Sequence, residues 1–175
     1  MEKENIMQPI LYLLRGAPGT GKTTLAAALH EKLRCPWFEF GWIPEFRSLN
    51  PHTEISYEEE CTLSAENLVL VVRNYFAHGF EAVIVSDLED AHIPAFAYAF
   101  SGIADVKILT LDCDDALRTQ RILTRDNGNG YRDTDAAAEI AQRIRALPYA
   151  GELRLDSGKM TAEEMCESVL LPQNR

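Results

Sequence analysis

The chain has 175 residues, of which 46% are hydrophobic and 25% are charged, and its formal net charge is -10 at pH 7. This length and composition predict one compact domain spanning residues 1–175, because two domains would each be too small. The acidic excess argues against long nucleic acid as a principal partner, since proteins that grip it usually present a basic face.

Cysteine usage and hydropathy restrict the compartment. The four cysteines are widely spaced and form no metal-binding pattern, which favours free thiols in a reducing environment. The amino-terminal residues lack the apolar run of a signal peptide, and no stretch approaches 18 continuous apolar residues. We therefore expect a cytoplasmic protein without membrane contact, either a monomer or a homodimer.

In chain order, apolar runs that predict strands alternate with segments of helical periodicity. The expected strands are 10–14, 37–40, 82–85, 106–111 and 153–155. The expected helices are 22–34, 64–78, 93–101, 114–124, 136–146 and 162–171. This alternation predicts βαβ units and a parallel sheet. Residues 41–57 form the longest irregular stretch, and such loops are often functional.

A phosphate-binding motif follows the first expected strand and opens the first expected helix. The sequence matches G-x-x-x-x-G-K-[ST], the P-loop or Walker A pattern. Its residues are Gly16, Ala17, Pro18, Gly19, Thr20, Gly21, Lys22 and Thr23. The glycines let the backbone approach a phosphate closely, and the loop amides and the helix N-terminus face the anion together.

The side chains of the motif predict binding of ATP with Mg²⁺. Lys22 is placed to reach the β- and γ-phosphates, the Thr23 hydroxyl to ligate magnesium, and Thr24 to bond the α-phosphate. We expect Lys22 to be exposed, so that its truncation abolishes ATP use with little loss of stability.

An acidic residue follows the third expected strand. P-loop sites usually pair the loop with a carboxylate at the end of a neighbouring strand, which holds magnesium. Asp87 is the best candidate for this metal and catalytic role, with Asp90 as a second carboxylate on the acceptor side. The alternative is that Ser86 and Asp87 cap a turn.

Three arginines lie late in the chain. Arg118, Arg121 and Arg125 are spaced so that one helical face can present all three, and a Gly/Asn-rich stretch, 126–130, follows them. Guanidinium groups on a mobile segment above the P-loop could neutralise the transferring phosphoryl group and exclude water. The alternative is a charged surface helix.

This layout resembles the small P-loop kinases, a superfamily that includes nucleotide, shikimate and gluconate kinases and the zeta-toxin and chloramphenicol phosphotransferase groups. The resemblance covers nearly the whole chain, although only the P-loop is highly specific. It implies an α/β three-layer fold with a five-stranded parallel sheet in the order 2-3-1-4-5. It also implies a lid at roughly 118–133, whose first arginine, Arg118, contacts the nucleotide, while Arg121 and Arg125 serve catalysis. The loop that starts at Asp156 would edge the adenine pocket.

In such kinases an Asp-x-Asp pair after the second strand supplies the base for the acceptor hydroxyl. Here Glu39 matches the first position and Gly41 the second, so the pattern is incomplete. We expect Glu39 or Glu45 to act as the base. Arg47 would hold an anionic acceptor group, and Trp42 would either stack on a flat acceptor or pack in the core.

The leading hypothesis is therefore an ATP- and Mg²⁺-dependent kinase acting on a small hydroxylated acceptor such as a nucleoside, nucleotide, sugar or antibiotic. The alternative is a nucleotide-binding regulatory ATPase without an acceptor, which Gly41 favours. The chain lacks the Asn-Lys-x-Asp tetrapeptide that reads guanine, which argues against a GTPase.

Overall fold

The computed structural model of the chain describes residues 8–42, 55–125 and 130–171. Its centre is a sheet of five strands in the order β2-β3-β1-β4-β5, and every neighbouring pair is parallel. The strands are β1 (Ile10–Arg15), β2 (Trp37–Glu39), β3 (Ala82–Ser86), β4 (Asp105–Asp112) and β5 (Leu153–Asp156). The fold class and strand order predicted from the sequence are confirmed.

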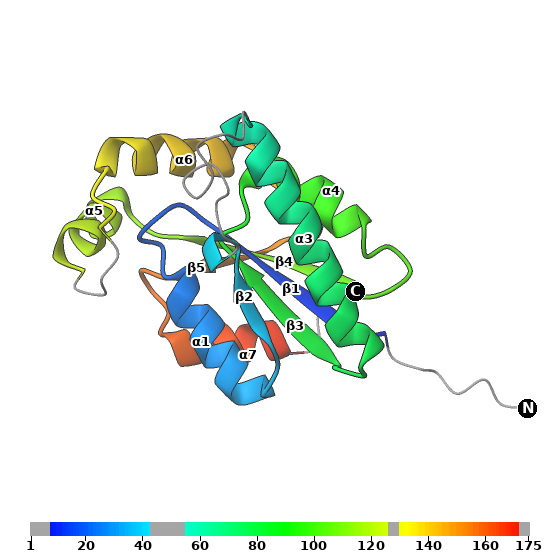
Figure 1. The fold of residues 1–175 in the computed structure, drawn as a ribbon. Helices are drawn as coiled ribbons and strands as arrows, with labels where there is room; N and C mark the ends of the chain where they lie inside the picture. Colours follow the sequence, from blue (N-terminus) through cyan, green and yellow to red (C-terminus); the bar gives the residue numbers. More distant parts are fainter. Residues whose placement is uncertain (1–7, 43–54, 126–129, 172–175) are drawn as a thin grey trace, which may run out of the picture.

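Helices cover both faces of the sheet and its carboxyl edge (Figure 1). The α-helices are α1 (Lys22–Leu33), α3 (Tyr57–Ala77), α4 (Ile93–Tyr98), α5 (Asp115–Thr124), α6 (Thr134–Ala146) and α7 (Ala162–Leu170). Two short 3-10 helices are η1 (Phe40–Trp42) and η2 (Asp90–His92). The prediction that the second long helix begins at residue 64 is wrong. Ser56 and Glu59 form a capping box that starts α3 at Tyr57.

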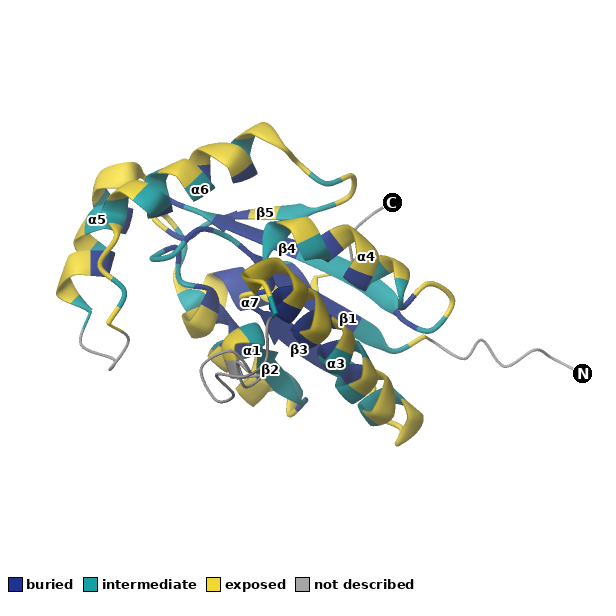
Figure 2. Cartoon of the chain, turned by 45° about the horizontal axis from the view of Figure 1, so that its top comes forward, coloured by how far each residue is buried: buried dark blue, intermediate teal, exposed yellow. Residues whose placement is uncertain are grey.

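Two apolar clusters hold the layers together. On one face α1 and α7 pack onto the sheet through Leu25, Leu29 and Met165. On the other face α3 and α4 pack through Leu68 and Phe96. Strand β1 serves both clusters because alternate side chains point to opposite faces, and this explains its continuous apolar run. Figure 2 shows the resulting pattern, a buried sheet between helices that are exposed on their outer sides.

Helices α5 and α6 lie together beyond the carboxyl ends of the strands (Figure 1). In open parallel sheets this edge is where ligands bind. The P-loop, the end of β3 and the end of β2 meet there, so the fold brings together segments that are far apart in the sequence. Over the described ranges, none of the helices has the length and apolar character needed to span a membrane.

Candidate active site

The phosphate loop joins β1 to α1 and packs tightly against α5. Gly19 has a φ of +86°, a conformation that side-chain-bearing residues rarely adopt. A Cβ at Gly19 would lie 2.9 Å from Cγ1 of Ile122 and 3.0 Å from the carbonyl oxygen of Arg118. The loop therefore requires glycine for its backbone conformation and for its closeness to α5.

The N-terminus of α1 is open towards the loop. Gly21 is its N-cap, without a side-chain capping hydrogen bond, and the first turn carries no acidic residue. By contrast, α3 and α7 begin with capping boxes completed by Glu59 and Glu164. Since the first amides of a helix lack partners within it, this end of α1 suits an anion supplied from outside.

Lys22 points back over the loop. Its Nζ donates to the carbonyl oxygens of Gly16 at 2.8 Å and Ala17 at 3.2 Å, and it lies 3.0 Å from Oδ1 of Asp87. Lys22 is only 8% exposed, so the expectation of an exposed lysine is wrong. Two loop carbonyls and the Asp87 carboxylate thus hold the ammonium at the edge of the phosphate loop.

Asp87 follows β3 in a left-handed conformation with a φ of +61°. This is uncommon for a residue with a side chain, and such conformations cluster at functional sites. Its carboxylate is 48% exposed and faces Lys22. The neighbouring Ser86 is fully buried, and its Oγ accepts a hydrogen bond from Nε1 of Trp37 at 2.9 Å. Ser86 thus has a structural role, whereas Asp87 faces the P-loop.

Oxygen ligands from three elements converge beside the loop. The Thr23 hydroxyl at the start of α1 donates to Oε1 of Glu39, at the end of β2, at 3.0 Å. Asp87 completes the group from β3. No cluster of three or more His, Cys, Asp or Glu residues within the described ranges could hold a metal by itself. Mg²⁺ prefers oxygen ligands and is usually bound by one or two carboxylates plus phosphates, so these residues fit a magnesium that arrives with a triphosphate.

A cavity of about 930 Å³ opens above the loop. One wall is the P-loop with Lys22 and Thr23, a second is formed by Arg121 and Arg125, and a third is the connection from β5 to α7. Its lining residues are Pro18, Gly19, Gly21, Lys22, Thr23, Thr24, Glu39, Asp87, Arg121, Thr124, Arg125, Tyr131, Ser157, Met160, Thr161, Ala162 and Met165. The volume lies within the range of small-ligand sites and is large enough for a nucleotide.

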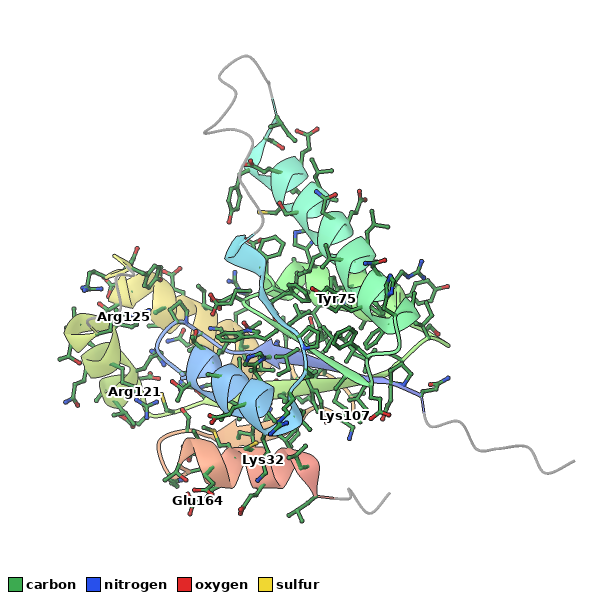
Figure 3. All side chains as sticks on the ribbon, turned by 60° about the horizontal axis from the view of Figure 1, so that its bottom comes forward. Lys32, Tyr75, Lys107, Arg121, Arg125 and Glu164 are labelled. Atoms are coloured by element: carbon green, nitrogen blue, oxygen red, sulfur yellow. The ribbon has the colours of Figure 1, made fainter. Side chains whose placement is uncertain are left out.

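Two of the three arginines reach this cavity, Arg121 from α5 and Arg125 from the residue that follows the helix (Figure 3). Arg121 donates to Oγ of Ser157 at 3.1 Å and to its carbonyl oxygen at 2.8 Å. The guanidinium of Arg125 lies 5.9 Å from the centre of the Tyr131 ring. Arg118 lies behind the loop. It is 1% exposed and pairs with Asp115 at 2.7 Å, so its nucleotide contact stays a prediction.

A second, smaller cavity of about 290 Å³ adjoins the first and shares Asp87 with it. Its lining residues are Phe40, Gly41, Tyr57, Glu60, Cys61, Ser64, Asp87 and Glu89. The hydroxyl of Tyr57 donates to Oε1 of Glu89 at 2.5 Å. This hydrogen bond is the main cause that raises the pKa of Tyr57 above its usual value, so the phenol stays protonated. Three of the lining residues, Glu60, Asp87 and Glu89, carry carboxyl groups.

Comparison with known proteins gives a consistent fold. No family model matches the chain, and no curated protein matches it in sequence. A sugar kinase from Janibacter sp. HTCC2649 superposes with a TM-score of 0.67 at 16% identity, over 93% of this chain and 92% of that one. The APS kinase CysC of Mycobacterium tuberculosis, solved with AMPPNP and APS, gives 0.65 at 16% identity over 94% and 96%. Shikimate kinase from Bacteroides thetaiotaomicron gives 0.60 at 17% identity over 93% and 96%.

The fold is that of the P-loop kinases. On it, the structure brings together most of the side chains that the sequence singled out around the phosphate loop, namely Lys22, Thr23, Glu39, Asp87 and Arg121. Their individual roles stay predictions. The residues predicted to bind an acceptor are placed differently.

Of the residues predicted to bind an acceptor, Asp90 pairs with Arg15 through two hydrogen bonds and is not among the residues that line either cavity. Trp42 ends η1. Glu45 and Arg47 lie outside the described residues.

Sequence reasoning missed three residues of the smaller cavity. Tyr57 was placed in the irregular stretch 41–57 and Glu60 was not singled out, whereas Glu60 is 2% exposed and lines the cavity. Four residues of α3 follow the spacing i, i+3, i+4 and i+7, namely Tyr57, Glu60, Cys61 and Ser64. With the start of the helix known, this spacing would have placed them on one helical face. Glu89 gave no signal beyond its nearness to Asp87.

Proposed function

We propose that this protein is an ATP- and magnesium-dependent kinase that transfers a phosphoryl group to a hydroxyl of a small acceptor. One observation carries the proposal: the phosphate-loop cavity and a smaller cavity that carboxyl groups line share Asp87. A kinase needs two adjoining sites with a charged group between them. A regulatory ATPase needs only the first.

In this proposal the chain binds the nucleotide with groups that are already oriented. The loop amides and the N-terminus of α1 receive the phosphates. Lys22 leaves the carbonyls of Gly16 and Ala17 and binds the β- and γ-oxygens. Magnesium, held by Thr23 and Asp87, supplies further charge neutralisation when bound. Arg121 and Arg125, on the wall of the cavity opposite the phosphate loop, offset the negative charge of the transferred phosphoryl group and exclude water from it.

The acceptor occupies the smaller cavity. Its volume of about 290 Å³ suits a compact molecule such as a single sugar or nucleoside. The Asp87 carboxylate accepts the proton of the attacking hydroxyl while the new oxygen–phosphorus bond forms and ADP leaves. Glu89, fixed by Tyr57, accepts hydrogen bonds from other acceptor hydroxyls. Glu39 then holds the Thr23 hydroxyl in place and is not needed as the base. Because Asp87 is the base, the absence of a carboxylate at Gly41 does not prevent the reaction.

The second candidate is a regulatory ATPase that uses water as its only acceptor. Gly41, where related kinases carry a second carboxylate, favours it. Such a protein would hydrolyse ATP slowly at a rate that no small molecule changes.

Coupled ADP release tests the proposal with a panel of nucleosides, nucleotides, sugars and small hydroxylated antibiotics. We expect at least one acceptor to raise turnover. We expect Glu89→Gln to lower that turnover about tenfold or more without changing ATP affinity, because one hydrogen bond to a charged group contributes about 1.5–3 kcal/mol. The matched control is Glu58→Gln, the same substitution at an exposed position in the first turn of α3, which does not line the cavity. Turnover indifferent to every acceptor would favour the regulatory ATPase.

A further inference from the structure

The chain segments that carry the phosphate loop and Asp87 separate where they reach the site. Parallel pairing between β1 and β3 ends at Leu14 and Ser86. Beyond this pair, Gly16 turns into the loop, and Asp87 turns away with a φ of +61°. Strand pairing between β1 and β3 therefore stops one residue before Asp87, and side-chain contacts add to what holds Asp87 near the loop.

One such contact, made by Lys22, faces the phosphate-loop cavity and would last only until a nucleotide binds. Lys22 bridges the two segments because it bonds to the Gly16 carbonyl and to Asp87 together. In the proposed function the same ammonium transfers to the phosphates. The contact between Lys22 and Asp87 is then lost once ATP is bound, which is when the position of Asp87 matters most.

A second contact lies behind the loop and does not face the cavity. The guanidinium of Arg15, the last residue of β1, is 1% exposed and makes a two-point contact with Asp90, whose second bond is 2.9 Å long. It also donates to Oε2 of Glu152 at 3.0 Å and to the carbonyl oxygen of Leu147 at 2.8 Å. The Tyr149 ring lies 4.4 Å from it. Arg15 thus joins the end of β1 to the turn after β3 and to the segment that leads into β5.

The partners of Arg15 are themselves fixed. Glu152 accepts hydrogen bonds from Thr110 at 2.6 Å and from Arg154 at 2.5 Å. The Tyr149 hydroxyl donates to the carbonyl oxygen of Asp90 at 3.0 Å. The positive charges of Arg15 and Arg154 therefore neutralise the negative charges of Asp90 and Glu152. Burial lowers the pKa of Arg15, but Asp90 and Glu152 raise it more, so the guanidinium stays charged.

Leu147 connects this cluster to the lid side. It is the C-cap of α6, the helix that begins at Thr134, close in sequence to Arg125 and Arg132. Its carbonyl oxygen lies at the negative end of the helix dipole, where a cation is favourable. The turn of Asp87 and the far end of α6 are thus bound to one guanidinium.

An ion cluster around a buried guanidinium is weak support for a role in stability alone, because well-packed apolar residues often stabilise as much. Its geometric effect is more specific, since the planar guanidinium fixes both the distance and the orientation of a carboxylate. We propose that Arg15 is a positioning residue, which holds the Asp87–Asp90 turn against the phosphate loop after Lys22 has moved to the nucleotide. This inference rests on the proposed function, because it takes Asp87 to act on magnesium and on the acceptor.

The test compares Arg15→Met and Arg15→Lys with a matched control, Arg145→Met. Arg145 also binds two carboxylates and a carbonyl, those of Asp112, Asp115 and Cys113, but it contacts no part of the turn. Three quantities are measured for each variant. They are the unfolding temperature, ATP affinity with Mg²⁺ and with EDTA, and kcat for ADP release with Mg·ATP alone or with an acceptor from the panel.

We expect Arg15→Met to lower kcat on the order of 100-fold, since a displacement of about 1 Å can have that effect. The gain in ATP affinity that Mg²⁺ gives should largely disappear, while affinity in EDTA stays within about twofold, because the loop amides are intact. Arg15→Lys should lose less, since an ammonium keeps the charge but cannot span all three partners. Arg145→Met should lose stability and keep both functional quantities.

Wild-type kcat and a wild-type Mg²⁺ effect in folded Arg15→Met would overturn the proposal and leave Arg15 a plain stability element. Failure of both Arg15 variants to fold, with Arg145→Met folded, would overturn it too. If the wild-type protein shows neither Mg²⁺-dependent ATP binding nor ADP release, the proposed function itself fails, which is a separate result.

Discussion

Replacing Lys22 by methionine separates the contribution of its ammonium to stability from its contribution to ATP binding. The substitution keeps an unbranched apolar stem but removes hydrogen bonds to Gly16 and Ala17 and the ion pair with Asp87. Asp87 is 48% exposed, so its share is at most about 1 kcal/mol. The two hydrogen bonds to loop carbonyls contribute about 0.5–1.5 kcal/mol each at most, and the cavity beside Lys22 lets the loop relax, so we expect about 1–2 kcal/mol in total. For a chain of this size this lowers the unfolding temperature by about 2–8 °C.

The effect of ligand is larger and opposite in sign. Mg·ATP at a hundred times its dissociation constant should stabilise the wild type by about 2.7 kcal/mol. This raises the unfolding temperature by about 5–11 °C. In Lys22→Met that shift should fall below about 1 °C, and ADP release should fall at least about 100-fold, as for loss of other charged groups at transition states.

Thermal scans with and without Mg·ATP and a coupled ADP assay measure both effects. The matched control is Lys32→Met, the same substitution at an exposed position of the same helix (Figure 3). It should leave the shift and the turnover unchanged. A full ligand shift with wild-type turnover in Lys22→Met would refute the assignment of the phosphate site.

Two further predictions concern the loop and the arginines. Gly19→Ala and Gly21→Ala each place an alanine in a left-handed backbone conformation, which should lower the free energy of unfolding by about 1–2 kcal/mol. Gly19→Ala should destabilise by about 1–3 kcal/mol more, because its Cβ would meet Ile122 at 2.9 Å whereas that of Gly21 has no atom closer than 4.0 Å. Equal unfolding free energies in urea would show that the loop does not pack against α5 in this way. Arg125→Ala should lower kcat more than ATP affinity, and Arg121→Ala should lower ATP affinity as well, because it also releases Ser157. A rise in KM with unchanged kcat in Arg125→Ala would contradict its part in the chemical step.

The sheet and the phosphate site could be predicted because their signals are local. The phosphate loop is defined by a buried strand, three glycines at fixed spacing and a helix, which all lie within residues 10–33. The alternation of strands and helices along the chain predicts the parallel sheet. Asp87 was found because metal-binding carboxylates follow neighbouring strands in such sites. In each case the residues that identify the feature are close together in the chain.

The acceptor side could not be predicted as well because its contacts are not local. The start of α3 depends on Ser56 and Glu59 in a stretch without clear periodicity, so the face carrying Tyr57 and Glu60 was missed. Helical spacing placed Arg118 with Arg121 and Arg125, but packing against Gly19 and the pair with Asp115 turn it away from the cavity.

Arg15 gave no signal, since its partners are Asp90, Leu147 and Glu152, which lie 75 or more positions away. Contacts at such separation follow from the three-dimensional fold and not from any local pattern. For the same reason Asp90 was assigned to the acceptor, although its carboxylate is bound to a residue at the end of β1.

The proposed function depends most directly on the phosphate loop being a nucleotide site. Isothermal titration calorimetry of the wild-type chain with Mg·ATP, repeated with ATP in EDTA and with Lys22→Met, measures this binding directly. The account predicts one site per chain, with affinity that falls when Mg²⁺ is removed and binding that is lost in Lys22→Met. Absence of binding heat with the wild type at millimolar Mg·ATP, or equal binding by Lys22→Met, would contradict it.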